Sequence, residues 1–370
     1  MPLISLVIPT RERASTLWAT LGSALSSSFQ DYECIVSDNC SNDNTEEVVR
    51  GTADARVRYF RTDRRLSMCD NWEFALSKVQ GRFVIFVGDD DAVTRDGVEL
   101  LARKIAELPT ERAFTWQTST YQWPIDDVPA KVIFESGPGS VEHAVHDLRA
   151  AARRVMRLGG WGYYRLPSAY HGAVATDSLR QIAARTGRVF HSTQPDLFTA
   201  LALPSVEPRY VRLASAVTIQ GRSAKSNGGV SVSKDGAKVT EQYVREFGDY
   251  RVHASLPPMP RVAGLIVDAF LRAKDMFPDV YAGTPFNYEA MWAFLRRLRL
   301  IDARQVLRET EAIRERHDFA RLKFAMYCFI HDAVAGRRSL LDRLQPTSSQ
   351  GAPPDIYQYA RQQRRLPSIQ

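Results

Sequence analysis

Phe83-Val84-Ile85-Phe86-Val87-Gly88-Asp89-Asp90-Asp91 is the stretch around which the rest of the chain is organised. It runs from five apolar residues directly into three aspartates. Such an apolar run is typical of a strand that is buried on both faces of a parallel sheet. Side chains alternate along an extended chain, so we expect Asp89 and Asp91 on one side and Asp90 on the other.

Two carboxylates on the same side repel each other, which raises their pKa values unless a cation lies between them. A hard divalent ion, Mg2+ or Mn2+, would neutralise them and would leave its other positions to water and phosphate. The alternative is a solvated acidic loop that caps the next helix, because Asp96 and Gly97 follow. The stretch alone supports both interpretations.

Strand-like and helix-like segments alternate through the first part of the chain. We expect strands at residues 3–8, 32–37, 57–61 and 83–87, and helices at residues 17–25, 46–50, 68–79 and 96–107. This order predicts a parallel sheet with right-handed crossovers and helices on both faces. The carboxyl ends of the strands share the edge where ligands bind. Asp38, the turn at Pro9-Thr10-Arg11 and the aspartate triplet should therefore lie on one rim.

The α/β pattern continues, with strands expected at 113–135, 172–175 and 210–219 and helices at 141–157, 177–185 and 197–203. A glycine-rich aromatic loop, 159–164, contains Trp161 and is either pinned by buried rings or a platform for the apolar face of a sugar. Asp196 begins a helix, where a capping carboxylate is the ordinary explanation. Arg222 and Lys225 lie in a Gly-, Ser- and Lys-rich loop, which is either a solvated linker or a cover over a pyrophosphate.

After residue 256 the spacing of apolar residues is typical of helices. We expect a domain over residues 1–230, a linker at 231–255, a helical C-terminal domain at 256–345 and a disordered tail at 346–370. Residues 294–300 are both basic and apolar, so they suit either contact with an anionic membrane or a packed helix with solvated arginines.

The composition is that of an ordinary globular protein, with 44% hydrophobic and 25% charged residues in a chain of 370. This length suggests one large domain and a smaller one. The net charge of +7 suits an anionic ligand or a membrane surface, and does not by itself indicate nucleic acid. Four cysteines without paired spacing indicate free thiols in a reducing cytoplasm. We find no secretory signal and no run that could span a bilayer.

Three motifs in a fixed order resemble glycosyltransferase family 2, of the GT-A fold. They are Ile8-Pro9-Thr10-Arg11-Glu12-Arg13, the aspartate-rich Ser37–Thr45 segment and the DxD-like Gly88-Asp89-Asp90-Asp91. The resemblance continues through Gly172-Ala173-Val174 and Pro195-Asp196, and covers residues 1–230. It implies a GT-A-type, Rossmann-like and mostly parallel α/β sheet flanked by helices, with the helical C-terminal region outside it.

The resemblance implies a nucleotide-sugar donor, with uridine as the expected nucleoside. Residues 1–110 would then form the nucleotide-sugar half and residues 111–230 the acceptor half. Asp91 would be the main metal ligand, and Asp89 would lie near the ribose and the metal, Mn2+ or Mg2+. The other expected donor-binding residues are Pro9, Thr10, Arg11, Asp38, Asn71 and Asp90.

The resemblance also implies a general base at Asp196, at the place where the family has the second member of a Glu-Asp pair. Pro195 replaces the first member, which is a departure from the pattern. His171 and His191 are alternative bases near the acceptor side. Trp161, His171, Arg222 and Lys225 are candidate acceptor or loop contacts. The resemblance implies transfer with inversion. Because the Gln-x-x-Arg-Trp motif of processive synthases is absent, we expect one sugar to be moved at a time.

The acceptor would be a glycan, a glycolipid or a small molecule, in the biosynthesis of bacterial surface polysaccharide or glycoconjugate. We expect a cytoplasmic protein with peripheral contact at the inner membrane face and self-association through the C-terminal helices. Two alternatives stay open. A nucleotidyltransferase would need a glycine-rich loop after the first strand, which Pro9-Thr10-Arg11-Glu12 lacks; a non-catalytic module would only bind a nucleotide-sugar or glycan.

Overall fold

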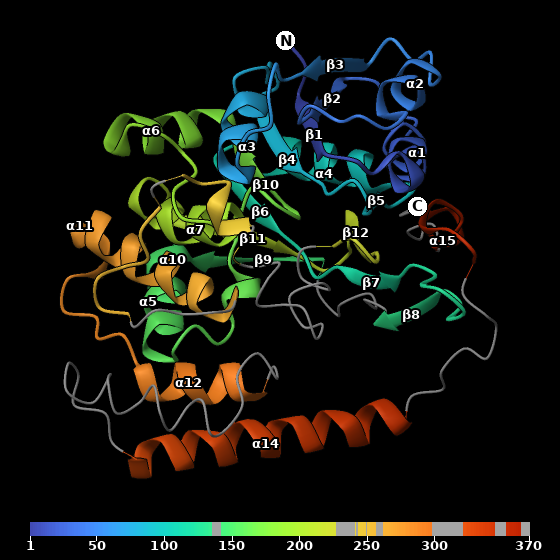
Figure 1. Cartoon of the computed structure of the whole chain (residues 1–370). Helices are drawn as coiled ribbons and strands as arrows, with labels where there is room; N and C mark the ends of the chain where they lie inside the picture. Colours follow the sequence, from blue (N-terminus) through green and yellow to red (C-terminus); the bar gives the residue numbers. More distant parts are fainter. Residues whose placement is uncertain are drawn as a thin grey trace.

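The computed structural model describes residues 1–134, 142–226, 241, 243–248, 250–256, 262–297, 321–344 and 353–363. An eight-stranded sheet forms its centre, in the order β3-β2-β1-β4-β10-β6-β11-β9 (Figure 1). Four parallel strands make up one half: β1 (Ile4–Thr10), β2 (Tyr32–Asp38), β3 (Val57–Arg61) and β4 (Phe83–Phe86). This half confirms the predicted strands and their parallel order.

The second half of the sheet has mixed direction. It contains β6 (Ala113–Thr115), β9 (His143–Asp147), β10 (Gly172–Ala175) and β11 (Arg209–Leu213). β10 runs antiparallel to β4 and to β6, and β11 is parallel to β6 and antiparallel to β9. A smaller sheet has the order β5-β12-β7-β8, from Ala92–Val93, Thr218–Arg222, Ser119–Gln122 and Lys131–Phe134.

Helices cover both faces of the large sheet because its strands alternate their apolar side chains between two cores. Leu6 packs with α1 (Ala14–Ala24) and α4 (Gly97–Glu107) on one face. Val7 packs with α3 (Met68–Leu76), α5 (Leu148–Arg157) and α7 (Pro195–Ala202) on the other. The shorter α2 (Thr45–Arg50) follows β2, and α6 (Thr176–Thr186) follows β10. The predicted α/β fold class is confirmed.

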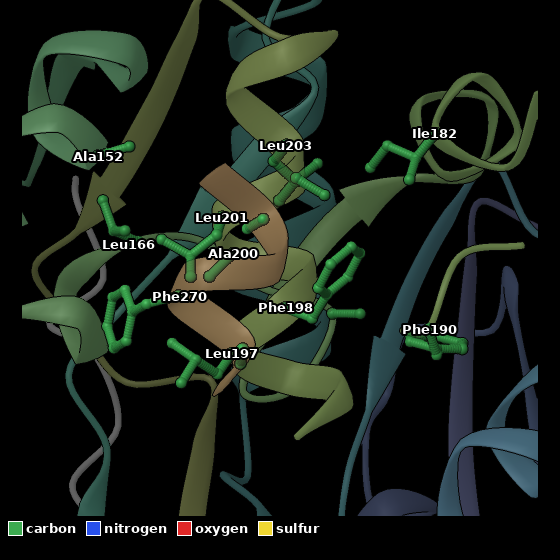
Figure 2. Close-up of a cluster of buried hydrophobic side chains, with 14 of the residues drawn as sticks. Ala152, Leu166, Ile182, Phe190, Leu197, Phe198, Ala200, Leu201, Leu203 and Phe270 are labelled. Carbon is green, nitrogen blue, oxygen red and sulfur yellow. The ribbon is translucent and has the colours of Figure 1, made fainter. Parts of the chain in front are cut away.

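The described part of the C-terminal helices shares a buried core with the sheet domain. Phe270 of α10 (Val262–Met276) and Trp292 of α12 (Tyr288–Arg297) belong to the same buried cluster as Leu201 of α7. Figure 2 shows Phe270 beside Leu166 and Leu197. The short α11 (Pro278–Tyr281) follows α10, and α12 lies along α14 (Arg321–Leu344) (Figure 1). We therefore propose that α10 to α12 fold together with the sheet domain.

Substituting Phe270 with Ala should destabilise the whole protein by about 3–5 kcal/mol, because it empties a large buried site. The ring is 1% exposed and packs 5.7 Å from Phe286, centroid to centroid. Urea unfolding measures the loss. The control is Phe329→Ala on α14, where the side chain is 75% exposed and the change should stay within about 0.5 kcal/mol. Equal losses in the two variants would contradict the shared core.

Local structure differs from the sequence expectation in two places within the sheet domain. The predicted helix at 141–157 begins only at Leu148, because residues 143–147 form the strand β9 and pair with β11. The Asp147 side chain caps the helix. The predicted strand at 210–219 is divided between β11 and β12, which lie in different sheets. Residues 135–141 lie outside the described residues.

The predicted disordered tail contains an ordered helix, α15 (Ile356–Gln362). Its buried Ile356 and Tyr359 pack near α1 and the small sheet, and the Tyr121 hydroxyl donates to the Pro353 carbonyl (2.6 Å). The rest of that tail, residues 346–352 and 364–370, lies outside the described residues, as do residues 231–240, 242 and 249 of the predicted linker.

The basic and apolar segment 294–300 is packed as far as the structure describes it. Phe294 and Leu295 are buried in α12, and Arg296 forms an ion pair with Asp332 (2.6 Å). Residues 298–300 lie outside the described residues. Within the described part of the chain, no helix is both long and apolar enough to cross a membrane.

Candidate active site

The aspartate triplet lies in a tight turn, not in an extended chain. The backbone amide of Asp91 donates to the Gly88 carbonyl (3.1 Å), so the turn redirects the side chains. As a result, Asp89 and Asp90 share one partner, Arg13, and Asp91 points elsewhere. The expected alternation, with Asp89 and Asp91 together, is therefore wrong.

Asp89 is tied to the end of β1. Its carboxylate accepts from the Thr10 hydroxyl (2.7 Å), the Arg11 amide (3.4 Å) and the Arg13 guanidinium (2.9 Å). Burial raises the pKa of Asp89 to about 6; the nearby Asp90 adds to the rise, and Arg13 opposes it. Burial disfavours the charged guanidinium, but Asp89 and Asp90 outweigh it and raise the pKa of Arg13. The turn therefore places two carboxylates close together, with the Arg13 guanidinium between them.

Asp90 connects the turn to the segment after β12. Its carboxylate accepts from the Ser223 amide (3.1 Å), the Ser223 hydroxyl (2.6 Å) and the Ser226 hydroxyl. Lys225 donates to the Glu12 carbonyl (3.0 Å), and Arg13 donates to the Lys225 carbonyl. Lys225 therefore lies beside the rim, in contact with the backbone of the β1–α1 turn.

Asp91 is completely buried and accepts from several sides. The amides of Gly221 (2.7 Å) and Gly88 (2.6 Å) and the Tyr170 hydroxyl (2.8 Å) donate to it, and the His171 Nε2 lies 3.2 Å away. Burial would raise the pKa of Asp91, but His171 and these donors overcome it and hold the pKa below its usual value. A Cβ at Gly221 would lie 1.7 Å from the Asp90 carbonyl oxygen, so this close approach requires glycine.

The expected nucleoside residues lie on neighbouring strand ends. Pro9 and Thr10 of β1 are in register with Ser37 and Asp38 of β2. The Asp38 carboxylate accepts from the Ser41 amide (2.9 Å) and the Tyr59 hydroxyl (2.6 Å).

Two further expected donor residues also have protein partners. The buried Asn71 accepts a hydrogen bond from the Ser37 hydroxyl (2.8 Å), directly below the same strand end. Arg11 forms an ion pair with Glu246 (2.9 Å), which brings the segment after residue 243 to the rim.

A cavity of about 340 Å3 opens on the other side of Asp91. Its lining comes from β6, β11, β12, the turn Tyr163–Arg165 and α7. The lining residues are Thr115, Trp116, Gln117, Thr118, Tyr163, Tyr164, Arg165, Leu166, Ser168, Tyr170, His171, Asp196, Leu197, Ala200, Arg212 and Gln220. Asp196, His171 and three tyrosines thus lie around one space.

Asp196 lies in the first turn of α7 with Pro195 at the helix start. Burial raises the pKa of this carboxyl; the amides of Leu197 and Asp196 and the charge of His171 oppose the rise. His171 adopts a positive φ of 50°, and its Nδ1 lies 2.8 Å from the Thr218 hydroxyl oxygen. A carboxylate with a raised pKa at the wall of a cavity is suited to accepting a proton.

The cavity lining does not include Trp161, His191 or Arg222. Trp161 packs edge-on against His331 of α14, 5.1 Å between centroids, so this ring pins the loop. Gly159, with φ of 59°, carries the loop past α12, where a Cβ would lie 2.1 Å from the Met291 amide nitrogen. The His191 Nε2 lies 3.2 Å from the Arg188 carbonyl oxygen, and burial lowers the pKa of His191. Arg222 is exposed at the end of β12.

Several residues of the site were not predicted from the sequence. Arg13 ends the motif at residues 8–13, but only the fold shows that it lies between two aspartates. Tyr170 has no sequence signal, since its position depends on an isolated backbone bridge to Phe86 at the end of β4. The cavity lining contains Trp116, Tyr163, Tyr164 and Tyr170, and Trp161 is not part of it.

Within the described residues, no group of three His, Cys, Asp or Glu side chains is arranged to hold a metal ion. Mg2+ and Mn2+ need only one or two carboxylates when phosphate and water supply the other ligands. Asp89 and Asp90 fit that smaller requirement, because both face the same cation, Arg13. Asp91 is less suited to the expected role of main ligand, since it is completely buried and does not face Arg13, the cation that Asp89 and Asp90 share.

Comparison with known proteins finds a family model similar to the N-terminal part. Residues 5–127 match the model described as "Glycosyl transferase family 2". A Campylobacter jejuni GalNAc(5)-diNAcBac-PP-undecaprenol beta-1,3-glucosyltransferase is 33% identical over 110 residues, 29% of this chain and 36% of that protein. An Escherichia coli UDP-Glc:alpha-D-GlcNAc-diphosphoundecaprenol beta-1,3-glucosyltransferase, WfaP, is 26% identical over 121 residues, 33% of this chain and 47% of that protein. The chain spans less than half the length of these two relatives.

A solved structure extends the likeness of the fold beyond the family match. The crystal structure of S. aureus TarS 1-349 in complex with UDP-GlcNAc has a TM-score of 0.50 and 16% sequence identity. The superposition covers 80% of this chain and 86% of that one. It supports the GT-A-type arrangement of the sheet and its helices.

Proposed function

We propose that this chain, whose residues 5–127 belong to glycosyl transferase family 2, moves one sugar from a nucleotide-sugar to an acceptor hydroxyl with inversion. The observation that carries this proposal is the position of Asp91 between two halves of a site. It accepts from Gly221 on the acidic rim and from Tyr170 on the cavity wall. A donor on the rim and an acceptor in the cavity would therefore meet beside this residue.

We propose a uridine diphosphate sugar as the donor. Pro9, Thr10 and Asp38 at adjacent strand ends would line the nucleoside, with Asn71 holding Ser37 below them. A carboxylate oxygen can accept more than one hydrogen bond, so Asp38 can hold its loop and still accept from uracil. The names of relatives that use UDP-Glc support this donor class.

Removing the Asp38 carboxylate by Asp38→Ala should weaken uridine diphosphate binding about 10- to 100-fold. The reason is the loss of a charge-assisted hydrogen bond worth about 1.5–3 kcal/mol. Calorimetric titration measures the affinity. Asp31→Ala, at an exposed position before β2, is the control and should bind as the wild type does. Unchanged affinity in Asp38→Ala would place the base elsewhere.

Asp89 and Asp90 are the residues that we propose would hold Mn2+ or Mg2+ together with the donor diphosphate. When bound, the cation would offset the negative charge of the departing diphosphate. Arg13 lies between the same carboxylates and supplies a positive charge there. Asp91 would stabilise the turn through its hydrogen bonds. In this proposal it does not bind the metal, which is the role expected from the sequence. Lys225 and Arg222 would approach the diphosphate from the segment after β12.

Asp196 is our proposed general base. It would take the proton from an acceptor hydroxyl in the cavity, while attack opposite the leaving diphosphate inverts the sugar carbon. His171 lines the cavity and also lies against Asp91. We propose that it holds the cavity wall in position relative to the acidic rim.

We propose that the acceptor is a glycan or glycolipid of a bacterial surface polysaccharide pathway. Relatives named for undecaprenol-linked acceptors and for teichuronic acid biosynthesis support this setting. Peripheral contact with the inner membrane face would bring the chain to such an acceptor. Self-association through the C-terminal helices is part of the same proposal.

The first experiment is a thermal-shift screen of UDP-sugars with and without Mn2+, followed by assay of the released product. A ligand at 100 times its Kd stabilises by about 2.7 kcal/mol. Release of uridine diphosphate is expected. Pyrophosphate release from a nucleoside triphosphate would indicate a nucleotidyltransferase, and binding without release over long incubation would indicate a non-catalytic module.

A further inference from the structure

Two arginines line the cavity beside Asp196. Arg165 ends the turn Tyr163–Arg165 and is exposed, and Arg212 lies on β11 and is half-buried. Within the described part of the chain, neither guanidinium lies within 4.0 Å of a carboxylate oxygen. By contrast, Arg11 and Arg13 on the rim are both in ion pairs. The cavity therefore holds two cationic side chains that protein anions do not neutralise.

Both arginines border the same cavity, Arg165 from the turn Tyr163–Arg165 and Arg212 from β11. The charges of both also oppose the rise that burial causes in the pKa of Tyr210. Their other contacts are neutral. Arg212 Nη2 lies 3.5 Å from Gln117 Oε1, and the Arg165 guanidinium lies 5.8 Å from the centre of the Tyr164 ring. Two like charges held near each other repel, and a bound anion would relieve that repulsion.

The lining of the cavity carries an excess of positive charge. It contains Arg165 and Arg212 against a single carboxylate, Asp196. A carboxylate ligand would neutralise one guanidinium, whereas a phosphate monoester or a diphosphate can pair with both. Guanidinium groups bind phosphate oxygens in a bidentate way, so two of them also orient the ligand. Trp116, Tyr163 and Tyr164 offer aromatic faces on which a sugar ring can pack.

We propose that Arg165 and Arg212 form a phosphate subsite for the acceptor, so that the acceptor is a sugar carrying a phosphate or diphosphate group. This inference rests on the proposed glycosyl transfer and names the substrate class of its acceptor side. Holding the phosphate at these arginines would leave the sugar ring against the aromatic wall, with a hydroxyl available to Asp196. A soluble sugar phosphate and a lipid-linked sugar diphosphate present the same chemistry.

The test is calorimetric titration of glucose 1-phosphate into the full chain after its rim has been saturated with UDP and Mn2+. The double variant Arg165→Gln/Arg212→Gln should bind glucose 1-phosphate at least tenfold more weakly, with unchanged UDP affinity. Arg165→Lys/Arg212→Lys, which keeps both charges, should recover part of the loss. Arg180→Gln, an exposed arginine on α6 outside the cavity lining, should bind as the wild type does.

The outcomes separate this inference from the proposed function. Failure of UDP to bind the wild type contradicts the proposed function. Normal UDP binding with equal glucose 1-phosphate affinity in wild type and double variant overturns the phosphate subsite alone. A matching loss of UDP affinity also overturns it, because the arginines would then serve the donor. Glucuronate binding that falls in the double variant while glucose 1-phosphate binding does not would replace phosphate by a carboxylate.

Two further ligands distinguish the sources of the phosphate. A glucose diphosphate ester with a short prenyl chain should bind at least tenfold more tightly than the soluble diphosphate ester if the natural acceptor is lipid-linked. Equal affinities support a soluble sugar phosphate. Both results support the subsite provided that the double variant weakens both ligands.

Discussion

Asp196→Asn is expected to lower kcat by about 10²–10⁴-fold, the usual contribution of a general base. Asparagine keeps the size of the side chain and cannot accept the proton of the acceptor hydroxyl. Donor binding should be unchanged, because the rim residues Asp89 and Asp90 are not altered. Steady-state kinetics with a UDP-sugar and its acceptor give kcat, and titration with UDP gives the affinity.

The pH profile provides a second readout of the same variant. Burial raises the pKa of Asp196, and only its unprotonated form can act as a base. The rate of the wild type should therefore rise as pH increases through that raised pKa, and the variant should lose this limb. The matched control is Asp177→Asn, an exposed aspartate in the first turn of α6. A collapse of UDP affinity with an unchanged chemical step would remove Asp196 from the role of base.

Asp91→Asn should destabilise the protein by about 3–5 kcal/mol, the range for breaking a buried charged pair. The carboxylate accepts from Gly88, Gly221 and Tyr170 and lies against His171. Asparagine would turn an amide N–H toward one of these donors, leaving a buried donor unsatisfied. Turnover should fall as well, because the same contacts join the rim to the cavity.

Urea unfolding with and without UDP measures both effects of Asp91→Asn. Asp96→Asn is the control, since Asp96 precedes α4 without a capping hydrogen bond from its side chain, and it should change stability by at most about 0.5 kcal/mol. Wild-type stability and full turnover in Asp91→Asn would show that this residue neither holds the turn nor links the two halves of the site.

The sequence predicted the first half of the sheet well because its signals are local. Apolar runs ending at Pro9, Asp38 and Gly88 are separated by helical periodicity, and parallel crossovers then bring their carboxyl ends to one edge. Thr10 and Asp38 are indeed in register, and Thr10 bonds to Asp89. The family resemblance pointed to the same residues.

The orientation of side chains on that edge depended on contacts that no local pattern encodes. The turn at Gly88 reverses the expected positions of Asp90 and Asp91, and Gly221, far along the chain, decides what Asp91 contacts. Residues 143–147 resemble the start of a helix in sequence but pair with β11 because a partner strand is available. In the sequence, Trp161 suited a sugar-binding surface and a packing residue equally well. Only its contact with His331 of α14 distinguishes the two.

The central claim is that the acidic rim binds the diphosphate of an activated sugar next to an acceptor cavity. A crystal structure of the complex with UDP and Mn2+ tests it most directly. We predict the diphosphate within hydrogen-bonding distance of Arg13, with the metal between it and the carboxylates of Asp89 and Asp90. A nucleotide bound away from residues 89–91, with these carboxylates contacting only protein, would contradict the account.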